Sequence, residues 1–511
     1  MLLKLEGEGP LYTRVYTTLR RHIIEGRFPP GERLPGTRSV ANALGVSRTV
    51  VLLAYSQLES EGYTTTRVGS GTFVAERPAT PETPEASAEA VADAQAIFRA
   101  PVAQPLPEVP LSRVATRVQQ APIPDHPLDL LDDDVGVVDL TDAAISYDTR
   151  ALKVWRRALS KAMSNLPDEL PSGSGVLSLR EAMLDYLNRE RGVVANVEDM
   201  VIVNSVQQAR DLIARVLVDE HTVVGVEEPC NPGVRYSFAA AGAHLVACPP
   251  DAEGLDVDRQ ADRLETARII HVSPTCHMPT GAAMSAARRE ALLEWAYARP
   301  AYIVEEDFDH DHRHGVRVSP ALQGADRHER VIYYMNNFAR AVYPAMQVGC
   351  VVVPPALREK FHAIKRLTDS DGIALRQYAW ADYLSEGEYA RSLRRLSQQL
   401  GQKCQLLADA LRRRLGSGIR IESRVATGQL LVHLPRLDAA WDTMVREEAL
   451  RTGLLLQSAA DWYLQPPAHT VLLLHYAAAS EAALETAVER LAYAYQVAMQ
   501  DVARAHARRS A

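Results

Sequence analysis

The sequence lacks a disulfide framework, long apolar segments and an overall positive charge. Its five cysteines include no CxxC pair, so we expect free, reduced thiols. The N-terminal stretch MLLKLEGEGP has no apolar signal-peptide core, and no segment is long and apolar enough to span a membrane. The formal net charge of −8 excludes a protein that is basic throughout. These absences predict a soluble protein of the cytoplasm.

Charge and length both indicate more than one domain. The first 76 residues carry nine lysines and arginines against seven glutamates, whereas the remainder of the chain is acidic. Such a bias is typical of a protein in which only the front part meets nucleic-acid phosphates. With 511 residues, of which 47% are hydrophobic, the chain is long enough for several domains and a sizeable core.

Residues 36–63, GTRSVANALGVSRTVVLLAYSQLESEGY, predict two short helices joined by a tight turn. Thr37 is expected to cap the first helix, and Gly45 to end it in the left-handed conformation. Ser47 is expected to cap the second helix, and Gly62 to close it. This arrangement is typical of a DNA-reading element, although helix-turn-helix shapes also occur in small packing domains that never touch DNA.

The second helix has one apolar and one polar side. Its inner face carries apolar residues at 3.6-residue spacing, namely Val50, Val51, Ala54, Tyr55 and Leu58. Arg48 and Thr49 stand at its N-terminal end, where a recognition helix meets base edges. We therefore expect these two residues to face DNA.

The flanking segments complete a winged-helix pattern. Upstream, apolar residues four apart predict a supporting helix, namely Leu11, Val15, Leu19 and Ile23. The run Pro29 to Gly31 predicts a turn. Downstream, two β-branched runs surround the triplet from Gly69 to Gly71, which predicts a two-stranded wing with Arg67 placed to reach phosphate.

Taken as a whole, residues 10–74 closely resemble the winged-helix domain of the GntR regulator family. The resemblance spans a domain that we place at residues 1–77. It implies that Arg38, Ser47, Arg48 and Thr49 contact double-stranded operator DNA. It also implies that the wing at Gly69 to Gly71 enters a groove.

Residues 78–127 are rich in proline, alanine and acidic side chains, as in ERPATPETPEASAEAVADAQ. Such a composition cannot bury enough apolar surface to fold alone, so we expect a semi-extended linker with a short helix at residues 88–100. A linker of this length would let the DNA-binding module of one subunit reach the body of another.

Residues 128–511 alternate β-rich and helical segments. Candidate strands are VIVN at 201–204, VVGV at 223–226, IIHVS at 269–273, YIVEE at 302–306, VIYYM at 331–335 and GCVVV at 349–353. Helical segments with apolar residues three or four apart lie between them. This alternation predicts an α/β domain with a largely parallel sheet covered on both faces. After Lys360 the pattern changes to that of a smaller α+β domain.

The order of these segments resembles a fold-type I aminotransferase, in the version fused behind a GntR winged helix in the MocR-type regulators. The motifs that carry the resemblance are SLREAMLDYL, QQARDL, EEPCNPGVR, SPTCHMPTG, VEEDFDHDHRH and YYMNNFARAVYPAMQVGCVVVP. Together with the front domain, the resemblance covers nearly the whole chain. It implies a site for pyridoxal phosphate (PLP), the cofactor of the family.

The residues that would hold this cofactor depart from the family pattern. The lysine that forms the Schiff base is replaced by Arg340, whose guanidinium stays protonated and cannot be the aldimine nucleophile. Gln347 stands where the family has a phosphate-binding arginine. Ser205 and Val206 replace a Gly-Ser pair that donates to the phosphate. Asn231 replaces the aromatic residue that stacks on the ring.

Other positions of the implied site are kept in type or are missing. A carboxylate for the pyridinium nitrogen remains as Glu306 or Asp307, with Phe308 where a tyrosine is usual. The arginine that would hold a substrate carboxylate is not evident in VLLLHYAAAS, where His475 lies. We expect His475, Asn231, Gln347 and Arg340 to line the pocket.

These departures predict that no covalent PLP forms and that the chain is not an enzyme. The body would instead form a homodimer, head to tail as the resemblance implies, with a possible small-molecule effector. One alternative is that Arg340 holds the phosphate or carboxylate of a noncovalently bound PLP-like ligand. Others are a working PLP-dependent aminotransferase with an attached regulatory domain, and a structural repressor without any effector.

A metal site is not expected. The segment 307–314 and its surroundings hold many potential ligands, namely Asp307, Asp309, His310, Asp311, His312, His314, Cys276, His277 and His475. Their spacing matches no standard zinc motif, and the segment aligns with an acidic loop that has no metal role in the family. We therefore predict a MocR-type transcriptional regulator without a metal.

Overall fold

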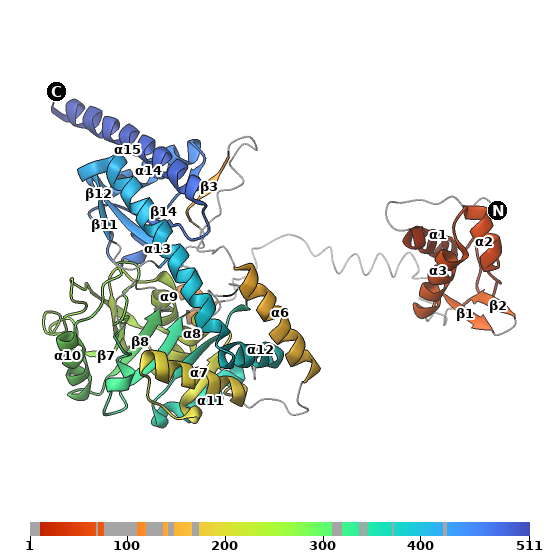
Figure 1. The fold of residues 1–511 in the computed structure, drawn as a ribbon, viewed down its shortest axis with the longest axis horizontal. Helices are drawn as coiled ribbons and strands as arrows, with labels where there is room; N and C mark the ends of the chain where they lie inside the picture. The colour runs from red at the N-terminus through yellow and green to blue at the C-terminus, as the bar shows by residue number, and fades with distance from the viewer. Residues whose placement is uncertain are drawn as a thin grey trace. The chain divides into compact units, whose positions relative to one another are not determined.

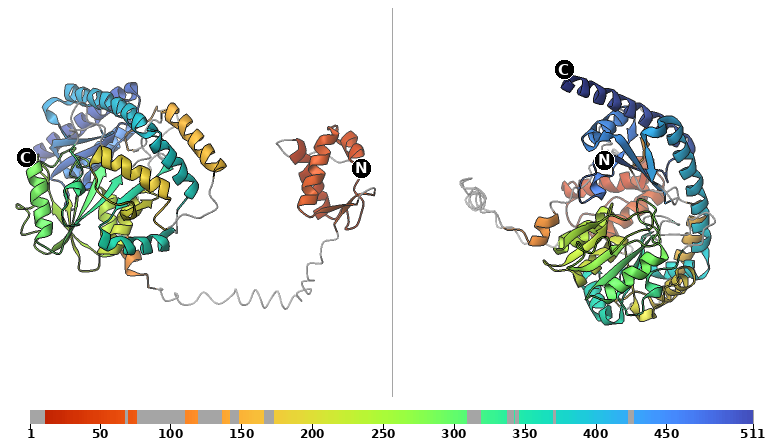
Figure 2. Two further views of the ribbon diagram at one scale, coloured as in Figure 1. Left: turned by 60° about the horizontal axis from the view of Figure 1, so that its bottom comes forward. Right: turned by 90° about the vertical axis from the view of Figure 1, so that its left-hand side faces the viewer.

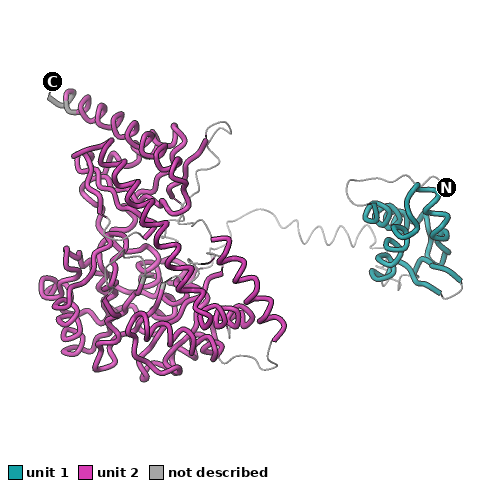
Figure 3. Tube along the Cα trace, in the orientation of Figure 1, with its two compact units in different colours: residues 1–109 teal, residues 110–511 magenta. Residues whose placement is uncertain are grey.

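A computed structural model describes most of the chain. The described residues are 11–67, 70–75, 110–118, 136–141, 148–165, 173–308, 319–336, 342, 346–369, 372–422 and 427–510. The chain divides into two compact units, Met1–Val109 and Pro110–Ala511 (Figure 3). Among the described helices, none combines the length and apolar character that a membrane crossing requires.

The described part of the first unit, residues 11–67 and 70–75, contains three helices and a two-stranded wing (Figure 1). Its elements are α1 (Leu11–Ile24), α2 (Thr37–Leu44), α3 (Arg48–Ser60), β1 (Thr64–Arg67) and β2 (Gly71–Val74). The strands pair antiparallel, with Thr64 opposite Val74 and Arg67 opposite Gly71. The predicted inner face of α3 is confirmed, because Val51 and Leu58 are fully buried.

One detail of the predicted helix-turn-helix is wrong. Thr37 does not cap α2, because the helix begins at Thr37 and the preceding residue, Gly36, occupies the extended N-cap position without a side-chain hydrogen bond. The Thr37 hydroxyl instead accepts a hydrogen bond from Arg48 Nε at 3.3 Å. Gly45 ends α2 with φ at 67°, in the predicted left-handed conformation.

The second unit is built on a seven-stranded sheet with the order β4-β10-β9-β8-β7-β5-β6. Its strands are β4 (Met200–Val203), β5 (Val223–Glu227), β6 (His244–Cys248), β7 (Ala267–Val272), β8 (Tyr302–Phe308), β9 (Val331–Asn336) and β10 (Gly349–Val352). Only β10 runs antiparallel to its neighbours. The six predicted strands are present, and the sequence analysis missed β6, a partly exposed edge strand whose short apolar run, Leu245 to Cys248, does not alternate with polar residues.

Helices cover both faces of this sheet, as Figure 2 shows. One face carries α8 (Val206–Leu217), α9 (Pro232–Ala241) and α11 (Arg358–Asp369). The other carries α6 (Thr149–Ser164), α7 (Leu177–Arg191), α10 (Ala286–Tyr297) and α12 (Ala374–Ser385). Because side chains alternate along a strand, neighbouring residues of β8 reach opposite helical layers.

A smaller α+β part follows along the chain. Its sheet has the order β11-β12-β15-β14, with β11 (Arg420–Glu422), β12 (Gln429–Asp438), β14 (Gln457–Ser458) and β15 (His469–His475). Helices α14 (Asp442–Arg451) and α15 (Glu481–Ser510) belong to it, and a parallel bridge joins β3 (Val138–Asp139) to β13 (Leu454–Leu455).

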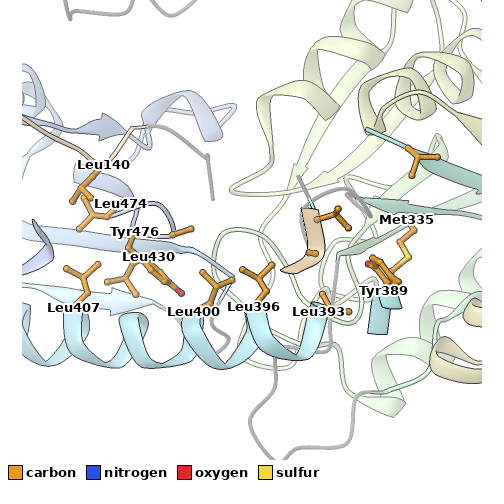
Figure 4. Close-up of a cluster of buried hydrophobic side chains, with 14 of the residues drawn as sticks. Leu140, Met335, Tyr389, Leu393, Leu396, Leu400, Leu407, Leu430, Leu474 and Tyr476 are labelled. Carbon is orange, nitrogen blue, oxygen red and sulfur yellow. The ribbon is translucent and has the colours of Figure 1, made fainter. Parts of the chain in front are cut away.

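The long helix α13 (Glu388–Leu415) joins the two parts of the body into one core. Leu393 of α13 lies toward Met335 of the large sheet (Figure 4). Further along the same helix, Leu400 and Leu407 lie toward the small sheet, where Leu430 is labelled (Figure 4). The helix therefore fixes the small part against the large one.

Part of the segment predicted as a linker belongs to the body. Helix α5 (Arg113–Val118) packs on α9, and its Arg113 and Arg117 form ion pairs with Glu220 at 2.5 and 3.0 Å. The second compact unit thus begins at residue 110, whereas the sequence placed the start of the body at residue 128. The helix predicted at residues 88–100 lies outside the described residues.

Candidate functional site

The candidate DNA-binding surface centres on the N-terminus of α3. The Ser47 hydroxyl accepts a hydrogen bond from the Val50 backbone N–H at 3.4 Å, so the predicted cap is confirmed. This cap fixes the first turn of the helix, on which Arg48 and Thr49 are exposed. A guanidinium and a hydroxyl at an exposed helix start are suited to hydrogen bonds with base edges and phosphates.

Two more residues that were predicted to contact DNA lie on the elements next to α3. Arg38 is exposed on α2. Arg67 is exposed at the end of β1, with its guanidinium carbon 4.9 Å from the centre of the Phe73 ring. Within the described part of the unit, neither residue forms an ion pair, and the same holds for Arg48. Their charges are therefore available to an external anion.

The tip of the wing is only partly described. Gly71 has φ at 112°, and a Cβ there would lie 2.7 Å from Arg33 Nε, so glycine is needed at this position. Gly69 lies outside the described residues.

In the body, three consecutive acidic residues at the end of β8 point to different partners. Glu305 accepts hydrogen bonds from the backbone N–H groups of Leu322 and Gln323 at 2.7 and 2.8 Å. Glu306 and Asp307 each form an ion pair with a buried arginine. Alternation along the strand explains the separation, because Glu306 faces the α8 layer and Asp307 the α7 layer.

Glu306 is the centre of a buried polar cluster. Its carboxylate receives Arg210 Nη2 at 2.7 Å, and Arg210 also donates through Nη1 to Asn231 Oδ1 at 3.2 Å and through Nε to the Tyr334 hydroxyl at 3.2 Å. Burial alone would raise the pKa of Glu306, but the charge of Arg210 outweighs it and holds that pKa below its ordinary value. The carboxylate is thus ionised and internally neutralised.

His271 of β7 completes the cluster in a neutral form. One of its ring nitrogens, Nε2, lies 2.7 Å from the Tyr334 hydroxyl and 3.6 Å from a Glu306 oxygen. Burial lowers the pKa of His271 to about 4. The imidazole therefore serves as a hydrogen-bond partner rather than as a second cation.

Asp307, the other predicted carboxylate, lies in the opposite layer. Arg191 of α7 binds it with two hydrogen bonds, from Nε at 2.7 Å and Nη2 at 3.1 Å. The hydroxyls of Thr275 and Tyr333 donate to the same carboxylate at 3.1 and 2.8 Å. This fully buried ion pair joins α7 to the sheet, so Asp307 is structural.

The N-terminal turn of α8 is also occupied by protein groups. The Ser205 hydroxyl caps the helix by accepting from the Gln208 N–H at 3.1 Å. The carboxylate of Asp369 accepts from Gln208 Nε2 at 2.9 Å and from the side-chain amide of Asn204, and it pairs with Lys365. An acidic side chain therefore lies beside the helix start at which the family resemblance implied a phosphate.

A small cavity lies between the large sheet and the small part of the body. It has a volume of about 40 Å³ and is lined by Glu227, Cys230, Asn231, His271, Ser273, His277, Met278, Glu306, Gln429 and Trp462. Space of this size holds about three water molecules. The Trp462 indole N–H and the Gln429 amide oxygen are buried and have no hydrogen-bond partner among the described residues.

The predicted pocket residues are only partly brought together. Asn231 lines the cavity, whereas Gln347 is exposed and is not part of the lining. His475 is not part of the lining either, but its Nδ1 lies 3.3 Å from the side-chain nitrogen of Gln429, which does line the cavity. Arg340 and the side chain of Phe308 lie outside the described residues.

The described residues do not fit PLP in the way that the resemblance implies. The cofactor brings a ring cation to a carboxylate and a phosphate to a donor-rich helix start. Here the Glu306 carboxylate already holds Arg210, and the start of α8 lies beside the Asp369 carboxylate. A bound cofactor would therefore bring its ring cation to a carboxylate that Arg210 already neutralises, and its phosphate beside the Asp369 carboxylate, which pairs with Lys365.

Sequence reasoning did not identify the two residues that decide whether PLP fits, Arg210 and Asp369. Arg210 interrupts the buried face formed by Ala209, Leu212 and Ile213, and a charge within an apolar stripe is a signal that points to a buried partner. Asp369 ends an ordinary polar helix and gave no such signal. Within the described ranges, no group of three or more His, Cys, Asp or Glu could hold a metal, and residues 309–314 lie outside those ranges.

Comparisons with known proteins divide the chain in the same two parts. The model of bacterial regulatory proteins of the gntR family matches residues 11–74, and that of class I and II aminotransferases matches residues 135–491. Among solved structures, LysN, an alpha-aminoadipate aminotransferase of Thermus thermophilus, has a TM-score of 0.66 and 21% identity over 76% of this chain and 98% of that one. This likeness shows the fold alone.

Curated relatives that the chain matches over most of its length are regulators by name. A probable rhizopine catabolism regulatory protein of Rhizobium meliloti, MocR, is 30% identical over 502 residues, which cover 97% of this chain and 96% of that protein. The HTH-type pyridoxine biosynthesis transcriptional regulator PdxR of Corynebacterium glutamicum is 27% identical over 399 residues, or 78% of each chain. The chain therefore belongs to the MocR-type GntR transcriptional regulators, in which a winged helix is joined to a fold-type I aminotransferase-like domain.

Proposed function

We propose that this regulator reads operator DNA with α3 in the major groove and the wing against the adjacent backbone. The observation that supports this most directly is the exposed pair Arg48 and Thr49 on the capped first turn of α3. Arg38 and Arg67 would hold phosphates on either side. Because its partner is DNA, the protein would act in the cytoplasm. It would bind as a head-to-tail homodimer, and the operator would therefore contain a repeated site.

We further propose that the aminotransferase-like body serves dimerisation and effector sensing without covalent PLP and without catalysis. Two features support this: the Schiff-base position carries Arg340, and Glu306 is neutralised by Arg210. A guanidinium cannot replace the lysine as nucleophile. The remaining polar cavity is a candidate place for a small effector, since the Trp462 indole N–H and the Gln429 amide oxygen find no partner among the described residues.

The DNA-binding role is tested by measuring affinity for a selected operator and for random duplex with Arg48→Ala. A lost bidentate base contact costs about 1–3 kcal/mol, so operator affinity should fall about ten- to a hundredfold while random-duplex affinity falls little. Arg27→Ala is the matched control, because this exposed residue of the same unit pairs with Glu25 beside the end of α1. Unchanged operator affinity in Arg48→Ala would remove the assignment.

The cofactor proposal is tested by the absorbance spectrum of the purified protein with added PLP. We expect the spectrum of free PLP, without a protein-dependent band that borohydride removes. Such a band would show that another lysine forms an aldimine, and release of a keto acid from an amino acid would establish an enzyme.

A further inference from the structure

Two leucines on the recognition helix are left in water. Leu52 and Leu53 of α3 are 47% and 54% exposed. Other apolar residues of this helix face the core, and Val51, Ala54 and Leu58 are fully buried. The pair is therefore not needed to fold the unit.

The position of the pair is informative. Leu52 follows Arg48 by four residues and Leu53 follows Thr49 by four, so the leucines continue the face that begins with those two polar residues. The first two turns of α3 contain no acidic residue. The first carboxylate, Glu59, lies in the last turn and accepts from the Thr66 backbone N–H at 3.0 Å.

We propose that Leu52 and Leu53 read thymine, by contacting the C5-methyl groups of thymines next to the base that Arg48 contacts. The inference rests on the proposed DNA-binding function. The thymine methyl is the apolar group that the major groove displays, and an exposed aliphatic side chain on a recognition helix is complementary to it. The two leucines thus set sequence preference, whereas Arg48 supplies the polar contact.

A second copy of this chain is a less suitable occupant of the same surface. Pairing two such faces would also bring Arg48 toward the Arg48 of the other copy, and this like-charge contact disfavours association. DNA satisfies the arginine and the leucines together, because the groove offers acceptors and methyl groups side by side.

The test uses the full chain and duplexes that it selects from a random library. In the selected duplex, each thymine is replaced in turn by deoxyuridine, which removes only the C5-methyl group. We expect the wild-type protein to lose about fourfold in affinity at one or more positions, the effect of removing one methyl from an apolar contact. At those positions Leu52→Ala or Leu53→Ala should bind the thymine and deoxyuridine duplexes equally.

Leu11→Ala is the matched control, because Leu11 is 48% exposed on α1 of the same unit, and this variant should keep the wild-type deoxyuridine penalty. Wild-type indifference to every deoxyuridine would overturn the proposal, as would an unchanged penalty in both leucine variants. Failure of the proposed function looks different, because the protein would then select no duplex. A leucine variant that changes oligomeric state but keeps the penalty would favour self-association and also overturn the proposal.

Discussion

The two units of this regulator keep their arginines in opposite states. In the DNA-binding unit, Arg38 and Arg48 are exposed, and neither forms an ion pair within the described residues. In the body, Arg191 and Arg210 are buried and each holds a carboxylate at 2.7 Å. The comparison teaches that a guanidinium can meet an external anion only where the fold provides no carboxylate for it.

The cost of burial explains why the body neutralises its charges. Moving an ion out of water costs several kcal/mol, and a buried pair recovers this only with good geometry and further hydrogen bonds. Arg210 meets that condition with three different acceptors. The pairing that stabilises the body therefore occupies the Glu306 carboxylate to which the family resemblance assigned the ring nitrogen of PLP.

The largest effect is expected from breaking the buried pair. Arg210→Leu leaves the Glu306 charge buried and should lower the free energy of unfolding by about 3–5 kcal/mol. The double variant Arg210→Leu with Glu306→Leu should recover most of this loss. All five tryptophans lie beyond residue 150, so denaturant unfolding followed by tryptophan fluorescence reports on the body alone.

Arg189→Leu is the surface control for this experiment, because Arg189 is 56% exposed and pairs with Asp185 on α7. It should change the free energy of unfolding by less than about 0.5 kcal/mol. Equal effects of Arg210→Leu and Arg189→Leu would break the contrast between buried and exposed arginines.

The next effect is a pH dependence confined to the body. His271 takes up a proton near pH 6.5 when unfolded but only near pH 4 when folded, because burial lowers its pKa. Between these values the unfolded state binds more protons, so stability falls as the pH falls, by up to about 3 kcal/mol. His271→Gln should show a smaller loss between pH 6.5 and 4; an identical slope would contradict a buried neutral imidazole.

A smaller effect is expected in the DNA-binding unit from removing a cap. Ser47→Ala should cost about 1 kcal/mol, because the Val50 N–H at the start of α3 loses its side-chain acceptor and keeps only the Ser47 carbonyl at 3.1 Å. Hydrogen exchange of the α3 backbone amides measures this locally. Ser56→Ala, an exposed change within the same helix, serves as the control and should not speed exchange.

The smallest effect concerns a phosphate contact. Arg67→Ala should weaken operator and random duplex alike and lower the salt slope of binding by about 0.9, which amounts to about 3.5-fold between 50 and 200 mM salt. Titrations of both duplexes at several salt concentrations would measure it. Arg67→Lys keeps the charge and should keep the slope, and a loss of operator affinity alone would indicate a base contact instead.

Much of the fold follows from local sequence patterns. The six predicted strands of the large sheet and the helices of the winged-helix unit are present, because apolar periodicity and capping residues act over a few positions. The misplaced cap at Thr37 shows the limit of such reasoning, since Gly36 and Thr37 are both compatible with a helix start. Helix α5 was missed because its packing partners, α9 and Glu220, lie about a hundred residues away along the chain.

The candidate site likewise has some features that the sequence revealed and others that it did not. The sequence identified Ser47 as a cap, and the family resemblance pointed to Glu306 or Asp307 as the carboxylate for the cofactor ring; the structure buries both carboxylates. It did not reveal that Arg210 and Asp369 would occupy the charged ends of the implied cofactor site. Arg210 and Glu306 are 96 residues apart, and Gln208 and Asp369 are 161 apart, so only the packing of α8 and α11 on the sheet brings them together.

The sequence by itself determined that the chain joins a winged helix to an aminotransferase-like body, because motifs are properties of short segments. It also predicts that Arg340 stands at the Schiff-base position. Tertiary structure decided which arginines are free and which are bound. That outcome depends on burial and on partners contributed by distant elements, since a charge in water and the same charge in a core differ by several kcal/mol.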